Sequence, residues 1–231
     1  LDEAHHSSNN IYTKVINYFK PKLFLGMTAT PDKRDDNQQG KNIYEIFHYQ
    51  IAYEIRLQQA MEEDLLCPFH YFGISEIISL DDKMLQATKL TDAAFNQLTS
   101  DERVRHIIEQ SEYYGYSGNR VKGLIFCSRV KECEELSKKF NELGYRTVTL
   151  SGNDNEDKRQ EAFERLAMDE EDATEDRQPL DYIFSRDILN EGVDIVEVNQ
   201  VIMLRPTQSP IVFIQQLGRG LRKAPGKEYV V

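Results

Sequence analysis

The feature that most constrains the fold is a regular alternation of short apolar runs and amphipathic stretches between residues 121 and 223. The apolar runs have the length of strands, and they lie at 121–127, 146–152, 181–185 and 198–205. Residues with helical periodicity lie between or after them, at 130–144, 158–167 and 210–223. Strands that alternate with helices favour crossover connections and a parallel sheet. The sequence therefore predicts an α/β fold with a parallel sheet flanked by helices.

The first half of the chain shows a less regular pattern. An apolar run at 22–27 predicts a strand, apolar residues at 51–65 follow a helical period, and 69–75 alternate like a strand. A further helix is expected from Asp101 to Tyr114, with Asp101 as its cap. Residues 79–99 show no clean period and are a candidate linker.

Composition is typical of a globular protein, because 40% of the 231 residues are hydrophobic and 29% are charged. No apolar run approaches the roughly 20 residues that a membrane span needs. The chain opens with Leu-Asp-Glu, and no signal peptide is visible. Cys67, Cys127 and Cys133 lie in apolar or helical patterns, so we expect buried thiols and a cytoplasmic location.

The formal net charge of −11 argues against a simple phosphate-binding surface. Part of the excess comes from residues 169–176, where six of eight side chains are acidic, and this run is expected to be a solvated loop. Nucleic-acid binding therefore has to be argued from motifs.

Two adjacent carboxylates, Asp2 and Glu3, lie in the sequence Asp-Glu-Ala-His. Such a pair suits a nucleotide-phosphate site, where one carboxylate holds Mg²⁺ and the other takes a proton from the attacking water. The alternative is an ordinary solvated acidic pair. A hydroxyl-rich turn, GMTATP, follows the apolar run at 22–27.

A second candidate site lies near the end of the chain, in QQLGRGLRK. Gln215, Arg219 and Arg222 are spaced so that all three are expected on one face of a helix. Guanidinium groups match phosphate oxygens well. Gly218 and Gly220 weaken a helix and favour close approach of a ligand or backbone. The alternative is a solvated helix face.

Together these segments resemble the motifs of superfamily 2 DEAD/DEAH-box helicases, in the same order. LDEAHH is similar to motif II, GMTATP to motif III, GLIFCSR to motif IV, FSRDILNEGVDI to motif V and QQLGRGLRK to motif VI. The closer resemblance is to bacterial helicases grouped with the Res subunit of type III restriction enzymes. It implies a RecA-like sheet, with a remnant of the first helicase lobe at 1–52 (motifs II and III) and a nearly complete second lobe at 53–231 (motifs IV to VI).

The resemblance also implies roles for single residues around ATP. Asp2 would help to hold Mg²⁺, and Glu3 would polarise the attacking water. His5, Thr28 and Thr30 would couple the ATP cleft to the bound strand.

In the second lobe the implied roles concern the nucleotide and the nucleic acid. Gly192 and Asp194 would border the nucleotide, and Arg219 would act as the arginine finger, with Arg222 and Gln215 beside it. The residues expected to touch the phosphate backbone are Ser128, Arg129, Ser151, Gly152 and Ser185.

Some family features are altered or missing in these 231 residues. No GxxxxGK[ST] loop is present, so a first-lobe segment and further domains of the same polypeptide are expected elsewhere. Motif V has Ser185-Arg186 where many relatives have a Thr-Asp pair. A fused nuclease domain, common in the Res-like group, is not in this sequence.

The function expected is therefore part of an ATP-dependent helicase or translocase that acts on nucleic acid, with DNA favoured over RNA by the restriction-like resemblance. The 231 residues alone are expected to be inactive without the phosphate-binding loop. The motifs do not separate strand separation from translocation. The alternative is a motor-derived module that binds nucleic acid or protein without ATPase activity.

Overall fold

The computed structural model describes the chain except for residues 5–6, 8–9, 30–41, 78–89, 187–194 and 205–209. The described residues form two compact units, Leu1–Gln59 and Ala60–Val231. The division falls a few residues after the boundary expected between 52 and 53, which stays a prediction.

The first unit contains α1 (Asn10–Phe19), α2 (Ile43–Ile46) and the start of α3 (Leu57–Glu62). The Asn42 side chain caps α2 by accepting the Tyr44 backbone N–H at 2.9 Å. The helix predicted over 51–65 is wrong in its length, because only Leu57–Glu62 is helical. Ile51 and Tyr53 are exposed, so the apolar residues at this end of the predicted helix have no apolar surface to pack against.

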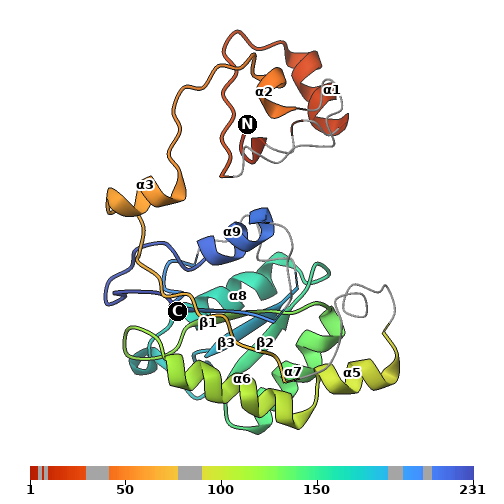
Figure 1. Ribbon diagram of the computed structural model, residues 1–231, viewed down its shortest axis with the longest axis vertical. Coiled ribbons are helices and arrows are strands. Elements are labelled where there is room, and N and C mark those ends of the chain that lie inside the picture. The colour runs from red at the N-terminus through yellow and green to blue at the C-terminus, as the bar shows by residue number, and fades with distance from the viewer. Residues whose placement is uncertain (5–6, 8–9, 30–41, 78–89, 187–194, 205–209) are drawn as a thin grey trace. The chain divides into compact units, whose positions relative to one another are not determined.

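The second unit is built on a four-stranded parallel sheet with the order β2-β3-β1-β4 (Figure 1). Its strands are β1 (Gly123–Phe126), β2 (Thr147–Leu150), β3 (Tyr182–Ser185) and β4 (Gln200–Met203). Every residue of the two central strands, β1 and β3, is buried. Strands covered on both faces read as continuous apolar runs, which is why these segments could be predicted. The predicted α/β fold is confirmed.

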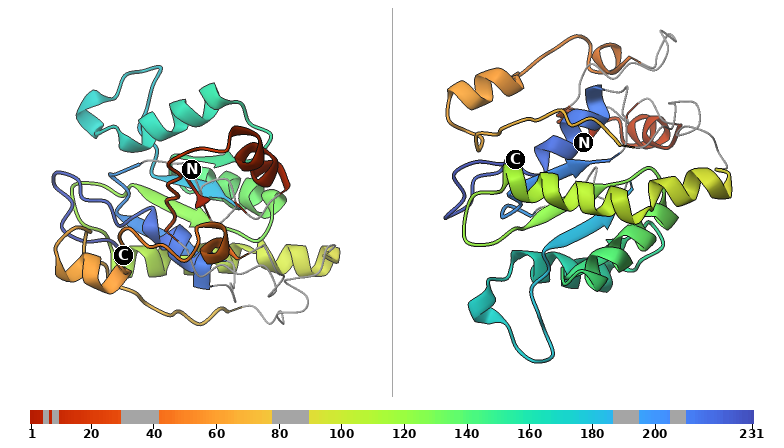
Figure 2. Two further views of the ribbon diagram at one scale, coloured as in Figure 1. Left: turned by 90° about the horizontal axis from the view of Figure 1, so that it is seen from above. Right: turned by 60° about the horizontal axis from the view of Figure 1, so that its bottom comes forward.

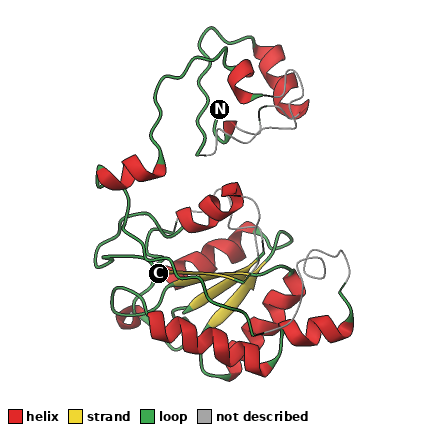
Figure 3. Ribbon diagram, in the orientation of Figure 1, coloured by secondary structure: helices red, strands yellow, loops and turns green. Residues whose placement is uncertain are grey.

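Helices cover both faces of this sheet (Figure 2; Figure 3). The elements that complete the unit are α5 (Asp92–Leu98), α6 (Asp101–Tyr114), α7 (Val130–Glu142), α8 (Glu156–Ala167), the short 3-10 helix η2 (Glu170–Asp172) and α9 (Pro210–Gly218). On one face Ile107 of α6 and Phe140 of α7 share a buried cluster with Phe184. On the other, Leu166 of α8 packs with Leu124. The result is a three-layer, RecA-like arrangement.

Local capping differs slightly from the prediction. Helix α6 spans Asp101–Tyr114 as expected, but the cap is Ser100, whose hydroxyl accepts the Arg103 N–H at 3.2 Å. Gly144 follows α7 at a φ of +96°, a conformation that favours glycine, as predicted. The candidate linker at 79–99 contains helix α5, capped by Thr91, so that expectation is wrong for its last residues.

Three further expectations concern single segments. Residues 69–75 form no regular strand; within the described residues they contribute one isolated bridge, between Phe69 and Val230. The acidic run is exposed but not merely solvated, because Asp169 pairs with Lys122 at 2.8 Å and Glu170 pairs with Arg146. The three cysteines are buried and free, as expected. None of the described helices is long and apolar enough to cross a membrane.

Candidate functional site

In the first unit, the backbones of motifs II and III lie side by side. The Ala4 N–H donates to the Met27 carbonyl at 2.8 Å, and the Met27 N–H donates to the Leu1 carbonyl at 2.9 Å. These bonds resemble strand pairing, although the predicted strand at 22–27 does not form as a regular element. They bring the acidic pair Asp2 and Glu3 next to the hydroxyl turn.

Gly26 is required at this junction. A Cβ atom at Gly26 would overlap the Phe47 ring and lie 2.9 Å from the Ala4 Cβ. The glycine therefore permits the close approach that pairs the two motifs.

The acidic pair itself has an unusual backbone. Glu3 has a φ of +47°, and its N–H donates to the Asp2 Oδ1 at 2.9 Å. Positive φ is uncommon for a residue with a side chain and is found preferentially at functional sites. The Asp2 side chain is exposed and Glu3 is half-buried.

Asp2 and Glu3 provide oxygen ligands, which suit Mg²⁺. Among the described residues, no group of three or more His, Cys, Asp or Glu side chains could hold a metal ion. A small number of protein carboxylates fits Mg²⁺, which keeps several waters and is completed by substrate phosphates. Thr28 is half-buried in the same unit. His5 and Thr30 lie outside the described residues.

In the second unit, the predicted nucleic-acid residues collect at one edge of the sheet. Ser128 follows β1, Ser151 follows β2, and Ser185 ends β3, where it pairs in register with Phe126 and Leu150. Because the strands are parallel, their carboxyl ends share an edge, which is where α/β sheets bind ligands.

These residues differ in accessibility. Ser128 and Arg129 are half-buried, and Gly152 is exposed. Ser185 is fully buried, so its hydroxyl does not face solvent in this structure. Gly192 and Asp194 of motif V lie outside the described residues.

The motif IV turn is held by a buried charge network. The Ser128 N–H donates to the Glu132 Oε2 at 2.9 Å, and Arg103 donates to the Glu132 Oε1 at 2.9 Å. Arg103 also donates to the Leu98 carbonyl at 2.7 Å and pairs with Glu76. Both Arg103 and Glu132 are almost completely buried.

The turn after β2 is held by Asp154. Its Oδ2 accepts the Ser151 N–H at 2.7 Å and the Ser151 hydroxyl at 3.1 Å. Burial, the largest single influence, raises the pKa of Asp154, but hydrogen bonds from Lys158 and Ser151 outweigh it and lower the pKa overall. The Ser151 hydroxyl is therefore engaged by a carboxylate. Its neighbour Gly152 is exposed.

Sequence analysis missed Arg159, which donates from Nη2 to the Gly152 carbonyl at 3.1 Å. Arg159 lies on α8, one helical turn after the Asn155 cap, with a partly exposed side chain. A basic residue in the helix that directly follows the turn predicted to contact phosphate was the available signal.

Motif VI departs from the prediction in its secondary structure. Helix α9 ends at Gly218, so Arg219 and Arg222 lie beyond it and not on one helical face with Gln215. The chain continues through tight turns, in which Gly220 N–H donates to the Leu217 carbonyl at 2.9 Å and Leu221 N–H to the Gly218 carbonyl at 3.3 Å. The two glycines end the helix because they stabilise it poorly.

The side chains of motif VI also differ in exposure. Gln215 is buried, Arg219 is half-buried and Arg222 is exposed. Arg219 donates from Nε to the Gln215 carbonyl at 3.3 Å, which holds its guanidinium against the last turn of α9. Arg219 belongs to the second unit, whereas Asp2 and Glu3 belong to the first.

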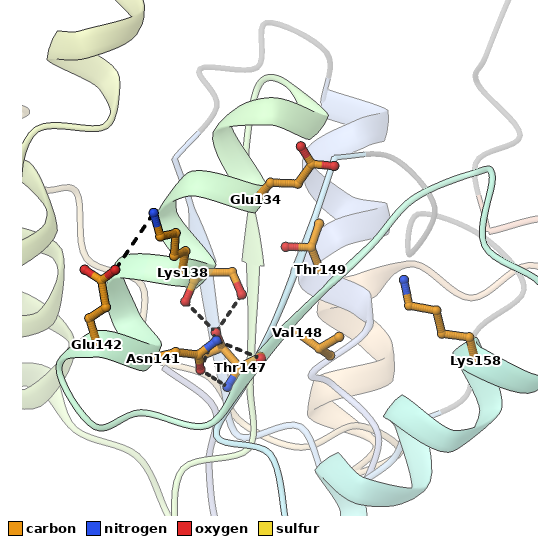
Figure 4. A pocket seen from close by; sticks show the side chains of 9 residues that line it. Glu134, Lys138, Asn141, Glu142, Thr147, Val148, Thr149 and Lys158 are labelled. Carbon is orange, nitrogen blue, oxygen red and sulfur yellow. Dashed lines mark hydrogen bonds and ion pairs between the residues drawn. The ribbon is translucent and has the colours of Figure 1, made fainter.

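A groove of about 630 Å³ lies along the edge strand β2 (Figure 4). Its floor includes Thr147, whose N–H donates to the Asn141 Oδ1 at 2.8 Å and whose carbonyl accepts the Asn141 Nδ2 at 3.3 Å. The Asn141 amide thus takes the place of a neighbouring strand at this position. We interpret the groove as a protected sheet edge.

Comparison with known proteins identifies the family to which the chain belongs. The family model "Helicase conserved C-terminal domain" matches residues 101–224, and the model "Type III restriction enzyme, res subunit" matches residues 1–33. The chain belongs to the helicase conserved C-terminal domain family. It is a superfamily 2 helicase chain related to the Res subunits, as the motifs indicated.

Curated relatives match along the whole chain at low identity. IRC3 of Saccharomyces cerevisiae, whose name describes it as an ATP-dependent helicase, is 22% identical over 99% of this chain and 32% of its own length. A 51.5 kDa protein of a Lactococcus phage is 22% identical over 100% of this chain and 47% of its own length. The chain therefore spans between about a third and a half of these two relatives.

Solved structures agree on the fold. A fragment described as an HsdR subunit of a type I restriction enzyme from Vibrio vulnificus has a TM-score of 0.71 at 22% identity, over 95% of this chain and 41% of that one. The Type ISP restriction-modification enzyme LlaBIII bound to DNA has a TM-score of 0.56 at 18% identity, over 99% of this chain and 17% of that one. At these identities the likeness supports the fold alone.

Proposed function

We propose that the chain forms the carboxyl-terminal part of an ATP-dependent motor that moves along nucleic acid. The observation that carries the proposal is that a helicase-family sequence folds with its motif IV and post-β2 residues on the carboxyl edge of one parallel sheet. Because the chain spans about a third to a half of its curated relatives, it works within a longer polypeptide that adds the phosphate-binding loop. We call that polypeptide the complete motor.

In this proposal the acidic pair serves the chemistry of ATP. Asp2 helps to hold Mg²⁺, which neutralises charge on the phosphates. Glu3 orients the attacking water and accepts its proton. The bond from the Glu3 N–H to the Asp2 Oδ1 supports a fixed position for the Asp2 carboxylate beside the backbone of Glu3.

Arg219 supplies the arginine finger, with Gln215 and Arg222 beside it. The bond from Arg219 to the Gln215 carbonyl orients the guanidinium on a rigid helix end. ATP that contacts both units would favour their closure, and hydrolysis would release it. Such a cycle converts chemistry into movement along the strand.

The nucleic acid is proposed to be DNA. Support comes from the relation to restriction subunits and from the structural likeness to LlaBIII, whose structure contains DNA. The proposed contact residues that are exposed or partly exposed are Ser128, Arg129, Ser151 and Gly152. Contacts through hydroxyl and backbone N–H groups tolerate a net charge of −11 better than a lysine-rich surface would.

The test compares Arg219→Ala, Arg219→Lys and Glu3→Gln in the complete motor. Arg219→Ala should lower ATP turnover with DNA by about 10³-fold or more, the range of an arginine finger. Arg219→Lys should restore little, because a point charge does not replace a planar fork. Glu3→Gln should slow hydrolysis and leave equilibrium binding of ATP largely intact.

The same assay separates the alternatives. Stimulation by RNA and not by DNA would overturn the proposed substrate. Near-normal turnover in Arg219→Ala would overturn the assignment of the finger. Absence of ATP turnover in the wild-type complete motor would favour a binding module.

A further inference from the structure

The turn that carries Arg219 and Arg222 is held by contacts from distant parts of the chain. The Leu221 carbonyl accepts the Cys67 N–H at 2.7 Å. The Gly220 carbonyl accepts the Lys227 Nζ at 3.0 Å. Motif VI therefore depends on residues outside the motif for its shape.

Lys227 contacts more than this turn. Its Nζ also donates to the Val198 carbonyl at 3.0 Å and to the Val196 carbonyl. Val196 and Val198 follow motif V directly, whereas Gly220 lies inside motif VI. An ammonium has three N–H donors and no acceptor, so three carbonyl oxygens from two segments match its capacity.

Burial makes this arrangement costly unless the carbonyl oxygens compensate for lost water. Burial lowers the pKa of Lys227 to about 8, and the nearby Cys67 and Glu197 oppose that change. The half-buried Lys227 ammonium bonds at once to the segment that follows motif V and to motif VI, so it is more than a surface charge.

We propose that Lys227 is a positioning residue that ties the segment after motif V to the motif VI turn, and so fixes the backbone that presents Arg219 and Arg222. The effect on catalysis rests on the proposed function, whereas the tie itself does not. The bonds of Lys227 join Val196 and Val198 to Gly220 within the second unit.

The first experiment uses the 231-residue chain and needs no ATP turnover. Lys227→Met has a similar length but removes all three donors. Native-state amide hydrogen exchange should become at least tenfold faster in peptides covering 195–203 and 212–222. Peptides covering β1 and α7 should keep their protection.

Lys223→Met is the matched control, because it removes the same charge from the same loop. Lys223 forms a surface pair with Asp64 at 2.6 Å, and both side chains are substantially exposed. Exposed pairs contribute little, so exchange over 195–203 and 212–222 should stay within about twofold of wild type. Lys227→Gln retains an amide with two N–H donors. We expect its hydrogen-exchange rates in these peptides to lie between those of wild type and those of Lys227→Met.

The second experiment measures steady-state ATP hydrolysis in the complete motor. Lys227→Met should lower kcat at least tenfold, with KM for ATP and the number of bound nucleotides per molecule nearly unchanged. Binding stoichiometry counts folded molecules, so a loss of folded protein would reduce it and would contradict positioning.

The two arms distinguish the outcomes. Unchanged exchange in Lys227→Met, or loss of protection across the whole second unit, would overturn the tie. Local loosening with unchanged kcat would overturn the role in catalysis. If the wild-type complete motor has no ATP turnover, the proposed function fails, and local loosening in the first experiment still supports the tie.

Discussion

Glu132 lies in the first turn of α7 and is fully buried, and its two carboxylate oxygens accept hydrogen bonds from different parts of the chain. One oxygen holds the Ser128 N–H, and the other holds Arg103 of α6. A buried ion pair adds little net stability compared with apolar residues, but removal of one charge leaves the other without compensation. The shape of the motif IV turn therefore depends on the charge of Glu132.

We predict that Glu132→Gln destabilises the fold by about 3–5 kcal/mol, the usual range for a broken buried pair. Glu76 still contacts Arg103 in this variant, so we expect the loss of unfolding free energy to lie near the lower end of that range. Urea unfolding measures the change. Glu134→Gln, an exposed position on the same helix, should change stability by less than about 0.5 kcal/mol. Equal effects of the two substitutions would show that the pair is not the cause.

Lys227 is a second single residue with a predicted effect, because its titration makes the free energy of unfolding depend on pH. Its pKa in the fold, about 8, lies below the unfolded value of 10.5, so the unfolded chain binds more protons between these values. Stability contributed by this group therefore rises with pH above about 8, because the penalty for a buried charge is relieved. We expect wild type to gain stability relative to Lys227→Met between pH 7 and pH 9.

At the scale of elements, the end of α9 shows how glycines shape motif VI. A helix that continued to Lys223 would place the two arginines on its surface, but α9 stops at Gly218. Gly220 then packs so closely that a Cβ atom would lie 2.8 Å from the Val230 Cγ1 and 3.2 Å from the Val201 Cγ2. The turn fits against β4 and the last residues of the chain only because residue 220 has no side chain.

We predict that Gly220→Ala destabilises the second unit by about 1–3 kcal/mol through overpacking. Gly218→Ala is the matched control, because a Cβ atom there meets nothing within 4 Å. That substitution should be neutral or stabilising by up to about 1 kcal/mol, since alanine favours a helix end more than glycine does. Chemical denaturation of both variants measures the difference. A similar loss in both would point to backbone conformation instead of packing.

For the whole molecule, we predict that the 231-residue chain alone does not hydrolyse ATP. Phosphoryl transfer depends mainly on positioning of the phosphates, and this sequence contains no GxxxxGK[ST] loop to position them. Phosphate release with saturating single-stranded DNA is the measurement. A turnover of about 1 s⁻¹, which is at the low end of typical kcat values of enzymes, would contradict the prediction.

The sequence predicted the part of the fold that depends on local pattern. Central strands of a parallel sheet are apolar along their whole length, so β1 and β3 could be found from composition, and the helices between them from their period. The motifs could be placed because they directly follow those strands. The helical period misled at 51–65, where the apolar residues have no surface to pack on, and after Gly218, where the glycines end α9.

The sequence by itself thus determined the α/β class, the helicase family and the positions of motifs II, III, IV and VI. Only the tertiary structure decided which groups hold those motifs in place. Arg103 reaches Glu132 across 29 residues, and Lys227 reaches Val196 across 31. A buried charge is stable only where its partners converge in space, and no local pattern records that convergence.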